Sequence, residues 1–281
     1  MTVPHIALHD GTSIPQLGFG VFQVPPADTA ATVATALEVG YRHIDTAQMY
    51  GNEAGVGAGL KDSGLSRDDV YVTTKLNNSF HRPDDARREI DASLERLGLD
   101  QVDLFLIHWP LPTQYDGDFV QTWQALIEAQ KAGKTRSIGV SNFQPAHLDR
   151  IVEETGVVPV VNQVEVHPFF ANEDVRAANA RHGVLTEAWS PIAKGTVMDD
   201  DTIGEIASLV GRTPAQVALR WHIQRGDIVF PKSMNRDRMR QNFELFDFEL
   251  EPAQMAAIDQ LDRGESGRTG PNPDVFDWIP S

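Results

Sequence analysis

The sequence of 281 residues predicts a (β/α)₈ TIM barrel that spans residues 1–281 as a single domain. Short apolar or β-branched runs alternate with helical patterns about eight times, without a linker or a shift in composition. The runs are nearly continuously apolar, which is typical of parallel strands that are covered on both faces. The length also fits, since such barrels have about 250 residues.

The chain begins with a predicted β-hairpin. Two short alternating runs flank Asp10 and Gly11, a strong turn signal, so residues 1–17 are expected to fold as a hairpin that closes the N-terminal end of the barrel. Eight strand runs follow. In chain order they are LGFGVF, YRHIDTA, VYVTTKL, VDLFLIHW, RSIGVSN, VVNQVEV, VLTEAWSP and DIVFPKS.

Helices are expected between and after these strand runs. Prolines such as Pro83, Pro145 and Pro214 indicate helix starts, and glycines just past apolar periodic stretches indicate helix ends. The end glycines are Gly40, Gly64, Gly98, Gly133 and Gly183. The expected helices are Thr29–Val39, Glu53–Ser63, Pro83–Leu97, Phe119–Ala132, Pro145–Glu154, Glu173–His182, Pro214–Arg225 and Arg236–Phe243.

Three segments near the C-terminus lie outside the repeat. Thr202–Val210 and Pro252–Leu261 have the pattern of extra short helices. Residues 264–281 are rich in glycine and proline and are expected to form an ordered tail that Phe276 and Trp278 anchor. An open doubly wound sheet is the alternative architecture, but LGFGVFQ lacks the third glycine of the G-x-G-x-x-G pattern and no helix follows at once.

Composition excludes several classes of function. The formal net charge of −16 repels phosphate backbones, so nucleic-acid binding is not expected. The absence of cysteine excludes disulfides and thiolate chemistry. No signal peptide opens the chain and no apolar stretch reaches the length of a membrane span. A soluble, cytoplasmic protein without a membrane partner is therefore expected.

Four polar residues stand at or near the ends of neighbouring strand runs. Asp45 and Lys75 are expected to form an ion pair, because an unpaired buried ammonium is costly. The lysine should lower the pKa of the nearby Tyr50 and make that phenol a general acid. His108 can orient an acceptor oxygen. The set predicts a proton-donating site for carbonyl reduction that needs no metal.

Each of these residues also has a plain structural interpretation. Taken singly, Asp45 and Lys75 would be a structural ion pair, His108 a core histidine, and Tyr50 a packing residue. Their occurrence together at consecutive strand ends favours a site, because barrel active sites gather at the carboxyl ends of the strands.

A hydride donor has candidate contacts further along the chain. Trp189 offers a flat face for a nicotinamide ring, and Ser141, Asn142 and Gln163 offer groups that suit its carboxamide. The segment FPKSMNRDRMRQNF forms a local basic cluster in an acidic chain and fits a ribose 2′-phosphate, which favours NADPH over NADH. Its candidate residues are Lys232, Ser233, Arg236, Arg238 and Arg240.

Several longer motifs carry a family resemblance. GFGVFQV, GYRHIDTAQMYGNEAGVGAGL, VYVTTKL, VDLFLIHWP, IGVSNF, NQVEVHP, WSPIAKG and VFPKSMNRDRMRQNF together cover most of the chain. The sequence resembles aldo-keto reductases, and within them a bacterial branch similar to diketogluconate reductases. The resemblance implies the barrel fold, NADPH and the catalytic set Asp45, Tyr50, Lys75 and His108.

The resemblance also implies contacts for the cofactor and the substrate. On the pyrophosphate side they are Gly20, Val21, Phe22, Ser190 and Ile192. At the 2′-phosphate and adenine they are Lys232, Ser233, Arg238, Gln241 and Asn242. The implied substrate pocket has Phe22, Met49, Trp109 and the tail residue Trp278.

Two positions depart from the family pattern. Asn77 stands where relatives often have tryptophan, so the pocket should be more open or more polar there. Lys194 stands where uncharged residues are common, and it is expected to alter the contact with the cofactor pyrophosphate.

The expected function is NADPH-dependent reduction of aldehydes or ketones to alcohols, with α-dicarbonyls and keto-sugars as candidate substrates and a monomer as the working form. Two alternatives remain open. One is a barrel that binds NADPH with little turnover and acts as a redox sensor or regulatory subunit. The other is a metal-dependent hydrolase using His108 and His167, although no second carboxylate–histidine spacing supports it.

Overall fold

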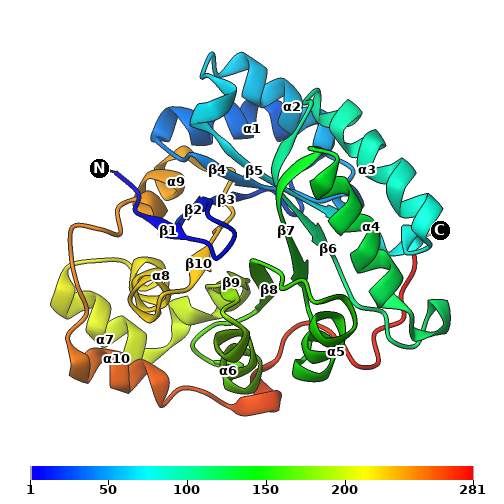
Figure 1. Cartoon of the computed structure of the whole chain (residues 1–281). Helices are drawn as coiled ribbons and strands as arrows, with labels where there is room; N and C mark the ends of the chain where they lie inside the picture. Colours follow the sequence, from blue (N-terminus) through cyan, green and yellow to red (C-terminus); the bar gives the residue numbers. More distant parts are fainter. Residues whose placement is uncertain (1, 281) are drawn as a thin grey trace.

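The computed structural model describes residues 2–280, so Met1 and Ser281, the outer ends of the expected hairpin and tail, lie outside the described residues. Eight parallel strands lie side by side in the order β10-β9-β8-β7-β6-β5-β4-β3 (Figure 1). Leu17 bridges Val229, and the Gly18 nitrogen donates to the Val229 carbonyl at 2.8 Å, which closes the sheet on itself. The (β/α)₈ barrel is confirmed.

The strands are short where the barrel closes. Gly18 and Gly20 of that segment lie against other chain atoms: a Cβ on Gly18 would come within 2.8 Å of the His43 ring, and one on Gly20 within 2.7 Å of the Phe230 carbonyl. Only glycine allows this approach. The barrel strands are β3 (Phe19–Gly20), β4 (His43–Asp45), β5 (Tyr71–Leu76), β6 (Val102–Ile107), β7 (Thr135–Ser141), β8 (Val161–Glu165), β9 (Leu185–Trp189) and β10 (Ile228–Val229).

Helices surround the barrel (Figure 1). They are α1 (Pro26–Val39), α2 (Glu53–Asp62), α3 (Pro83–Leu97), α4 (Phe119–Lys131), α5 (Pro145–Thr155), α6 (Glu173–His182), α7 (Asp201–Val210), α8 (Pro214–Arg225), α9 (Arg236–Phe243) and α10 (Pro252–Asp259). Four have the predicted bounds and five agree within two residues at each end. The predicted start of α1 at Thr29 was wrong by three residues, because Pro26 begins the helix where its missing N–H is not needed.

The N-terminal hairpin covers one end of the barrel. Strands β1 (His5–Ala7) and β2 (Ser13–Pro15) pair antiparallel around a turn in which Gly11 has φ +88°. Leu8 and Ile14 pack in one apolar cluster with barrel residues, and Figure 1 shows the hairpin across the middle of the ring. The barrel residues of this cluster are Leu104, Leu106, Val161 and Ile228.

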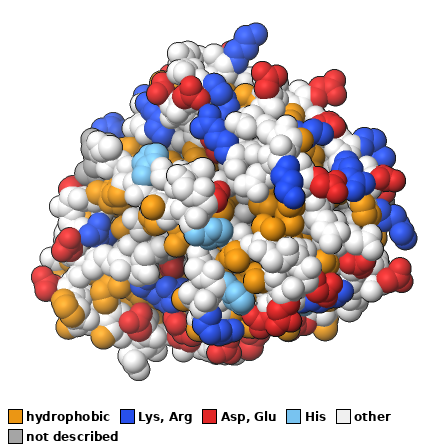
Figure 2. All heavy atoms as spheres, viewed as in Figure 1, with side chains coloured by type: hydrophobic (Ala, Val, Ile, Leu, Met, Phe, Trp, Pro, Cys, Tyr) orange, Lys and Arg blue, Asp and Glu red, His pale blue; other side chains and the backbone are white. Residues whose placement is uncertain are grey.

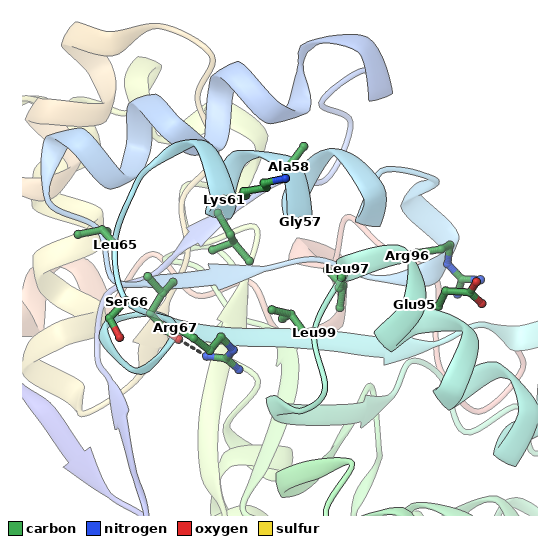
Figure 3. A pocket seen from close by; sticks show the side chains of 13 residues that line it. Gly57, Ala58, Lys61, Leu65, Ser66, Arg67, Glu95, Arg96, Leu97 and Leu99 are labelled. Carbon is green, nitrogen blue, oxygen red and sulfur yellow. Dashed lines mark hydrogen bonds between the residues drawn. The ribbon is translucent and has the colours of Figure 1, made fainter.

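The outer surface carries acidic and basic side chains interspersed over the hairpin face (Figure 2). A hollow of about 430 Å³ lies on the outside of the barrel between α2 and α3, and Figure 3 shows Lys61, Leu65 and Leu97 around it. None of the residues predicted for catalysis or cofactor binding lines it. Within residues 2–280, no helix is both long enough and apolar enough to cross a bilayer.

Candidate active site

The four predicted catalytic residues come from three neighbouring strands. Asp45 ends β4, Lys75 lies near the end of β5, and His108 follows β6 directly. Tyr50 lies in a 3₁₀ helix, η1 (Gln48–Tyr50), that follows β4. Because the strands are parallel, their carboxyl ends meet at one mouth of the barrel, opposite the hairpin.

Lys75 is fully buried and its charge has a defined partner. Its Nζ donates to Asp45 Oδ1 at 2.7 Å and to the Thr46 carbonyl at 2.8 Å. Burial lowers the pKa of Lys75, but Asp45 and Tyr50 outweigh that effect and the net pKa is raised. The ammonium is therefore charged at neutral pH, inside a wall of apolar strands.

Tyr50 lies over this ion pair. The Lys75 Nζ is 5.2 Å from the centre of the Tyr50 ring, and the Tyr50 and His108 ring centres are 5.7 Å apart at 76°. The structure thus brings the four predicted side chains together.

The expected lowering of the Tyr50 pKa was wrong in its net direction. Burial of the phenol raises its pKa, and the nearby charge of Lys75 offsets this only in part. The physical reason is desolvation, which disfavours the phenolate more than one ammonium can favour it. Tyr50 therefore holds its proton at neutral pH.

His108 is neutral at neutral pH. Burial lowers the pKa of its ring well below the usual range, and Lys75 adds to this effect. Its Nδ1 is buried and has no hydrogen-bond partner among residues 2–280. A neutral imidazole carries one N–H donor.

One buried acid at the site, Glu187, was not predicted from the sequence. Glu187 lies on β9 and is fully buried, and its Oε2 accepts from Gln163 Nε2 at 2.9 Å. The same nitrogen donates to Asp45 Oδ2 at 2.9 Å. Glu187 thus joins the ion pair through Gln163. An acid within the apolar run VLTEAW was the available signal, since ionisable residues are almost never fully buried without a partner.

Trp189, Asn142 and Ser141 form one polar network at the mouth. Trp189 Nε1 donates to Asn142 Oδ1 at 2.9 Å, and Asn142 Nδ2 donates to the His108 carbonyl at 2.9 Å. Ser141 Oγ donates to the Gln163 carbonyl at 2.8 Å. This network fixes the indole of Trp189 beside the four-residue set. Asn142 adopts φ 63°, a left-handed conformation that asparagine tolerates.

The residues expected on the pyrophosphate side lie at the end of β3 and in the loops that follow β3 and β9. Gly20 pairs with Asp45 in the sheet register, Val21 is buried, and Phe22 is 56% exposed. Ser190 and Ile192 follow β9, and Ile192 packs against the outer core.

Lys194 makes a contact that the sequence did not predict. Its Nζ donates to the Thr269 carbonyl at 3.1 Å, which ties the loop after β9 to the C-terminal tail. The position of its charge relative to a pyrophosphate stays a prediction.

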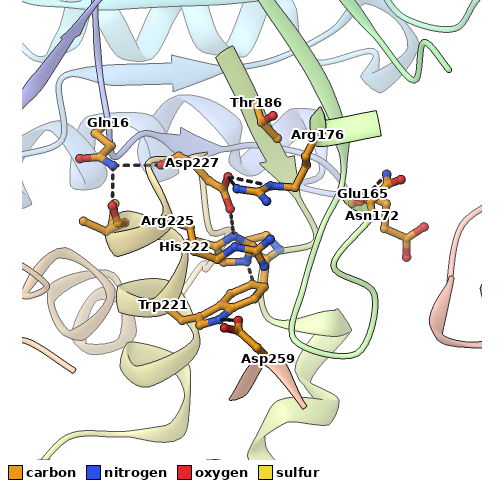
Figure 4. Close-up of polar contacts among 12 residues, drawn as sticks. Gln16, Glu165, Asn172, Arg176, Thr186, Trp221, His222, Arg225, Asp227 and Asp259 are labelled. Carbon is orange, nitrogen blue, oxygen red and sulfur yellow. Dashed lines mark hydrogen bonds and ion pairs between the residues drawn. The ribbon is translucent and has the colours of Figure 1, made fainter. Parts of the chain in front are cut away.

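Buried polar side chains hold the loop that follows β9 in place (Figure 4). His222 Nε2 lies 3.2 Å from the Pro191 carbonyl, and its Nδ1 lies 2.9 Å from Asp227 Oδ2. Arg176 Nη2 donates to the other oxygen of Asp227 at 3.1 Å. The helix α8 thus holds the loop that carries Ser190.

The basic cluster divides into paired and unpaired side chains. Arg236 forms an ion pair with Glu38 at 2.7 Å and is directed toward α1. Among residues 2–280, Lys232 and Arg238 form no ion pair, and Arg238 Nε lies 3.4 Å from Ser233 Oγ. Gln241 is exposed and Asn242 is buried on the same helix, α9.

The expected pocket residues have different environments. Met49 is half-buried in η1, and the exposed ring of Phe22 lies 5.1 Å from that of Tyr50. Asn77 Oδ1 accepts from the Ser79 nitrogen at 3.1 Å and caps a short turn. Trp109 is buried and lies 4.2 Å from the ring centre of Phe276 in the tail.

The C-terminal tail runs beside the mouth from the end of β8 to the turn after β5, and it is held at both places. Glu165 accepts from the Thr269 nitrogen at 2.7 Å and the Gly270 nitrogen at 2.9 Å. Further on, the Trp278 carbonyl accepts from Asn78 Nδ2 at 3.0 Å. Phe276 is a ring anchor, as predicted, but the Trp278 ring is not: it is 53% exposed, and this residue holds the tail through its backbone.

Comparison with known proteins decides the family. The model of the Aldo/keto reductase family matches residues 16–263. The chain belongs to the aldo/keto reductase family. Membership makes this reductase an NADP-dependent oxidoreductase that acts on carbonyl groups, as the sequence predicts.

Relatives of the reductase match over nearly their whole length. An aldo-keto reductase of Mycolicibacterium smegmatis is 48% identical over 98% of both chains. The methylglyoxal reductase DkgA of Escherichia coli K12 is 45% identical over 96% of this chain and 97% of its own. The predicted similarity to the diketogluconate reductase branch is confirmed.

Solved structures give the same result. The apo structure of Gox0644 superposes on the reductase with a TM-score of 0.95 at 46% identity, covering 99% of this chain and 100% of the other. A point mutant of Gox0644 in complex with NADPH has a TM-score of 0.94 at 45% identity, again covering 99% and 100%.

Proposed function

We propose that the protein reduces a small aldehyde or ketone with NADPH and that Tyr50 is the general acid. The observation that carries this proposal is the buried Lys75–Asp45 ion pair directly beneath the Tyr50 ring, with His108 at its edge. Arg82 also lies near a phenol and an imidazole, since it is 5.9 Å from the centre of the Tyr115 ring, on which His81 stacks, but among residues 2–280 it forms no ion pair.

The residues at the mouth fit NADPH. Lys232 and Arg238 have no carboxylate partner among residues 2–280, and unpaired cations suit a 2′-phosphate. The Gln163 Oε1 has no donor among those residues either, which suits the N–H of a carboxamide. The Trp189 indole, fixed by Asn142, offers the face for the nicotinamide ring.

The chain's own groups carry the proton chemistry. NADPH, when bound, supplies a hydride to the carbonyl carbon. Tyr50 gives its proton to the carbonyl oxygen as negative charge develops there, and Lys75 stabilises the phenolate that is left. Asp45 holds the ammonium in place. The neutral His108 donates its single N–H to the same oxygen and orients the substrate.

The raised pKa of Tyr50 fits this role. A phenol that keeps its proton at neutral pH is always available as a donor, and the fixed charge of Lys75 becomes more favourable once the proton has left. Solvent then returns a proton to the phenolate.

The proposed substrates are small α-dicarbonyls of the methylglyoxal type. Relatives that are 45–47% identical are named methylglyoxal reductases. The tail is bonded to Asn78 beside the mouth, and the neighbouring Asn77 stands where relatives often have a tryptophan, which suits a compact polar substrate. Keto-sugars are the second class to assay, since the chain is similar to the branch that includes diketogluconate reductases.

Steady-state oxidation of NADPH tests the proposal. We expect turnover of methylglyoxal and p-nitrobenzaldehyde by the wild type, and a loss of kcat of about 10²–10⁴-fold in Tyr50→Phe. Tyr71→Phe is the matched control, because Tyr71 lies in the same barrel and its hydroxyl has no partner among residues 2–280.

Two outcomes would contradict the proposal. Equal rates for Tyr50→Phe and the wild type would remove Tyr50 from the mechanism. Tight NADPH binding without turnover of any carbonyl would favour the alternative, a barrel that binds NADPH as a sensor or regulatory subunit.

A further inference from the structure

We propose that Glu187 is a positioning residue for the cofactor: together with Asp45 it fixes the Gln163 amide so that Oε1 faces the carboxamide N–H of NADPH. This inference rests on the proposed function, in which Gln163 contacts the carboxamide. Glu187 would act through Gln163 and would touch neither the cofactor nor the substrate.

The amide orientation follows from its two partners. Gln163 Nε2 is 2.9 Å from Asp45 Oδ2 and 2.9 Å from Glu187 Oε2. An amide nitrogen has two hydrogens, so both are used. The amide oxygen cannot take the place of the nitrogen, since Asp45 is ion-paired with Lys75 and an ionised carboxylate only accepts hydrogen bonds.

Asp45 alone would leave the amide free to turn. Its Oδ1 already accepts from Lys75, and Oδ2 can hold only one of the two hydrogens of Gln163. Glu187 takes the second hydrogen from the next strand, β9, because Gln163 and Glu187 are partners in the sheet register. Two hydrogen bonds from two strands fix both the position and the rotation of the amide, which is preorganisation for the ligand.

Glu187 acts in its neutral form. Burial, with a smaller contribution from the charge of Asp45, raises its pKa to about 8. The carbonyl oxygen of a neutral carboxyl still accepts from Gln163. The titratable groups that act on Glu187 are Asp45 on β4 and Lys75 and Tyr71 on β5, while its register partner on β10, Ile228, is apolar.

The fixed amide should make the protein distinguish coenzymes by the group attached to the nicotinamide ring. A fixed Oε1 accepts only from a donor, so it selects a nicotinamide with an amide N–H over a ring that lacks one. The 3-acetylpyridine analogue of NADPH is the probe, since a methyl group replaces the amide nitrogen in it.

Dissociation constants of NADPH and the analogue, measured by quenching of tryptophan fluorescence, test the inference. We expect the wild type to prefer NADPH. We expect Glu187→Leu to weaken NADPH by about tenfold while the analogue changes by less than about twofold, since one hydrogen-bond orientation is lost. Glu187→Gln should keep the preference, because its amide oxygen also accepts from Gln163.

A control variant separates the effect of a local cavity or of altered packing from the loss of the Gln163 amide orientation. Ile228→Val removes one methyl group next to Glu187 and should leave the preference intact. Equal weakening of both coenzymes by Glu187→Leu would overturn the inference, as would a retained preference.

A missing contact between Gln163 and the carboxamide and a missing role of Glu187 would give different results. If the wild type itself does not discriminate the two coenzymes, the proposed contact between Gln163 and the carboxamide is wrong and Glu187 has nothing to position. Because the assay measures binding and not turnover, the role of Tyr50 is judged separately.

Discussion

The two ends of the barrel interior are equally buried and opposite in chemistry. At the hairpin end, Leu104 and Ile14 are fully buried in an apolar cluster. At the mouth, Lys75 and Glu187 are just as buried, but both are ionisable. Buried apolar groups stabilise the fold, whereas buried charges rarely do and are destructive once unpaired. Burial therefore says little about function, and the chemistry of what is buried says much.

The largest expected effect comes from breaking the pair at the mouth. Lys75→Met should lower kcat by about 10³-fold or more, because the phenolate loses its cation. It should also destabilise the fold by about 3–5 kcal/mol, since Asp45 is left as an unpaired buried charge. Assays of turnover and of urea unfolding measure the two effects.

A double variant separates stability from chemistry. Asp45→Asn combined with Lys75→Met removes both charges and should recover most of the unfolding free energy without recovering the rate. Recovery of both would mean that the ion pair is structural only.

The hairpin end should show the reverse behaviour. Leu104→Ala removes packing from the apolar cluster and should cost about 2–5 kcal/mol in unfolding free energy. The kcat of the remaining folded protein should change little, because Leu104 lies at the end of the barrel opposite the mouth. A fall in kcat as large as that of Lys75→Met would break the contrast between the two ends.

Glu187 makes the free energy of unfolding depend on pH. Burial in the fold raises the pKa of its carboxyl from the ordinary value of 4.5 to about 8. Between these values the folded state holds the proton that the unfolded state has lost, so stability falls as pH rises. Glu187→Gln removes this loss and should be more stable than the wild type at pH 9, by on the order of a few kcal/mol.

The difference should shrink as the pH falls toward and below 4.5, where the unfolded state also binds the proton. Thermal unfolding of both proteins over pH 5–9 measures it. A constant difference over that range would show that Glu187 does not titrate with a raised pKa.

The smallest expected effect concerns the exposed basic cluster. Arg238→Ala should weaken NADPH by roughly 10-fold or more and leave NADH nearly unchanged, because only NADPH carries the 2′-phosphate. Coenzyme titrations at fixed ionic strength measure this, with Arg236→Ala as the control, since Arg236 already pairs with Glu38. An equal loss for both coenzymes would exclude a 2′-phosphate role for Arg238.

Most of the fold could be predicted from local signals. Helix α3 begins at Pro83 and ends before Gly98, which has φ 65°, so both ends were encoded in the sequence beside them. The start of α1 was missed, although Pro26 occupies the first turn and proline there is a known start signal. The gathering of Asp45, Lys75 and His108 followed from the parallel order of their strands alone.

The features that could not be predicted depend on contacts between residues far apart in the sequence and on pKa shifts that result from opposing effects. Glu187 acts through Gln163 on a neighbouring strand, a pairing that no local pattern encodes. The sign of the Tyr50 pKa shift depends on burial exceeding the effect of one charge, which sequence cannot weigh. The exposed Trp278 ring likewise reflects where the tail lies, 200 residues away from its partner Asn78.

The contact between β3 and β10 that closes the barrel fixes the distance between two groups of residues at the mouth. Gly20 pairs with Asp45 on one side and lies against the Phe230 carbonyl on the other, and Lys232 follows two residues later. Main chain alone thus spans the gap between the proton-donating pair and the first cation of the basic cluster, with no rotatable side chain in between. This stretch of backbone therefore sets the distance between Asp45 and Lys232. A methyl group on Gly20 would change that distance and so alter coenzyme binding and proton transfer together.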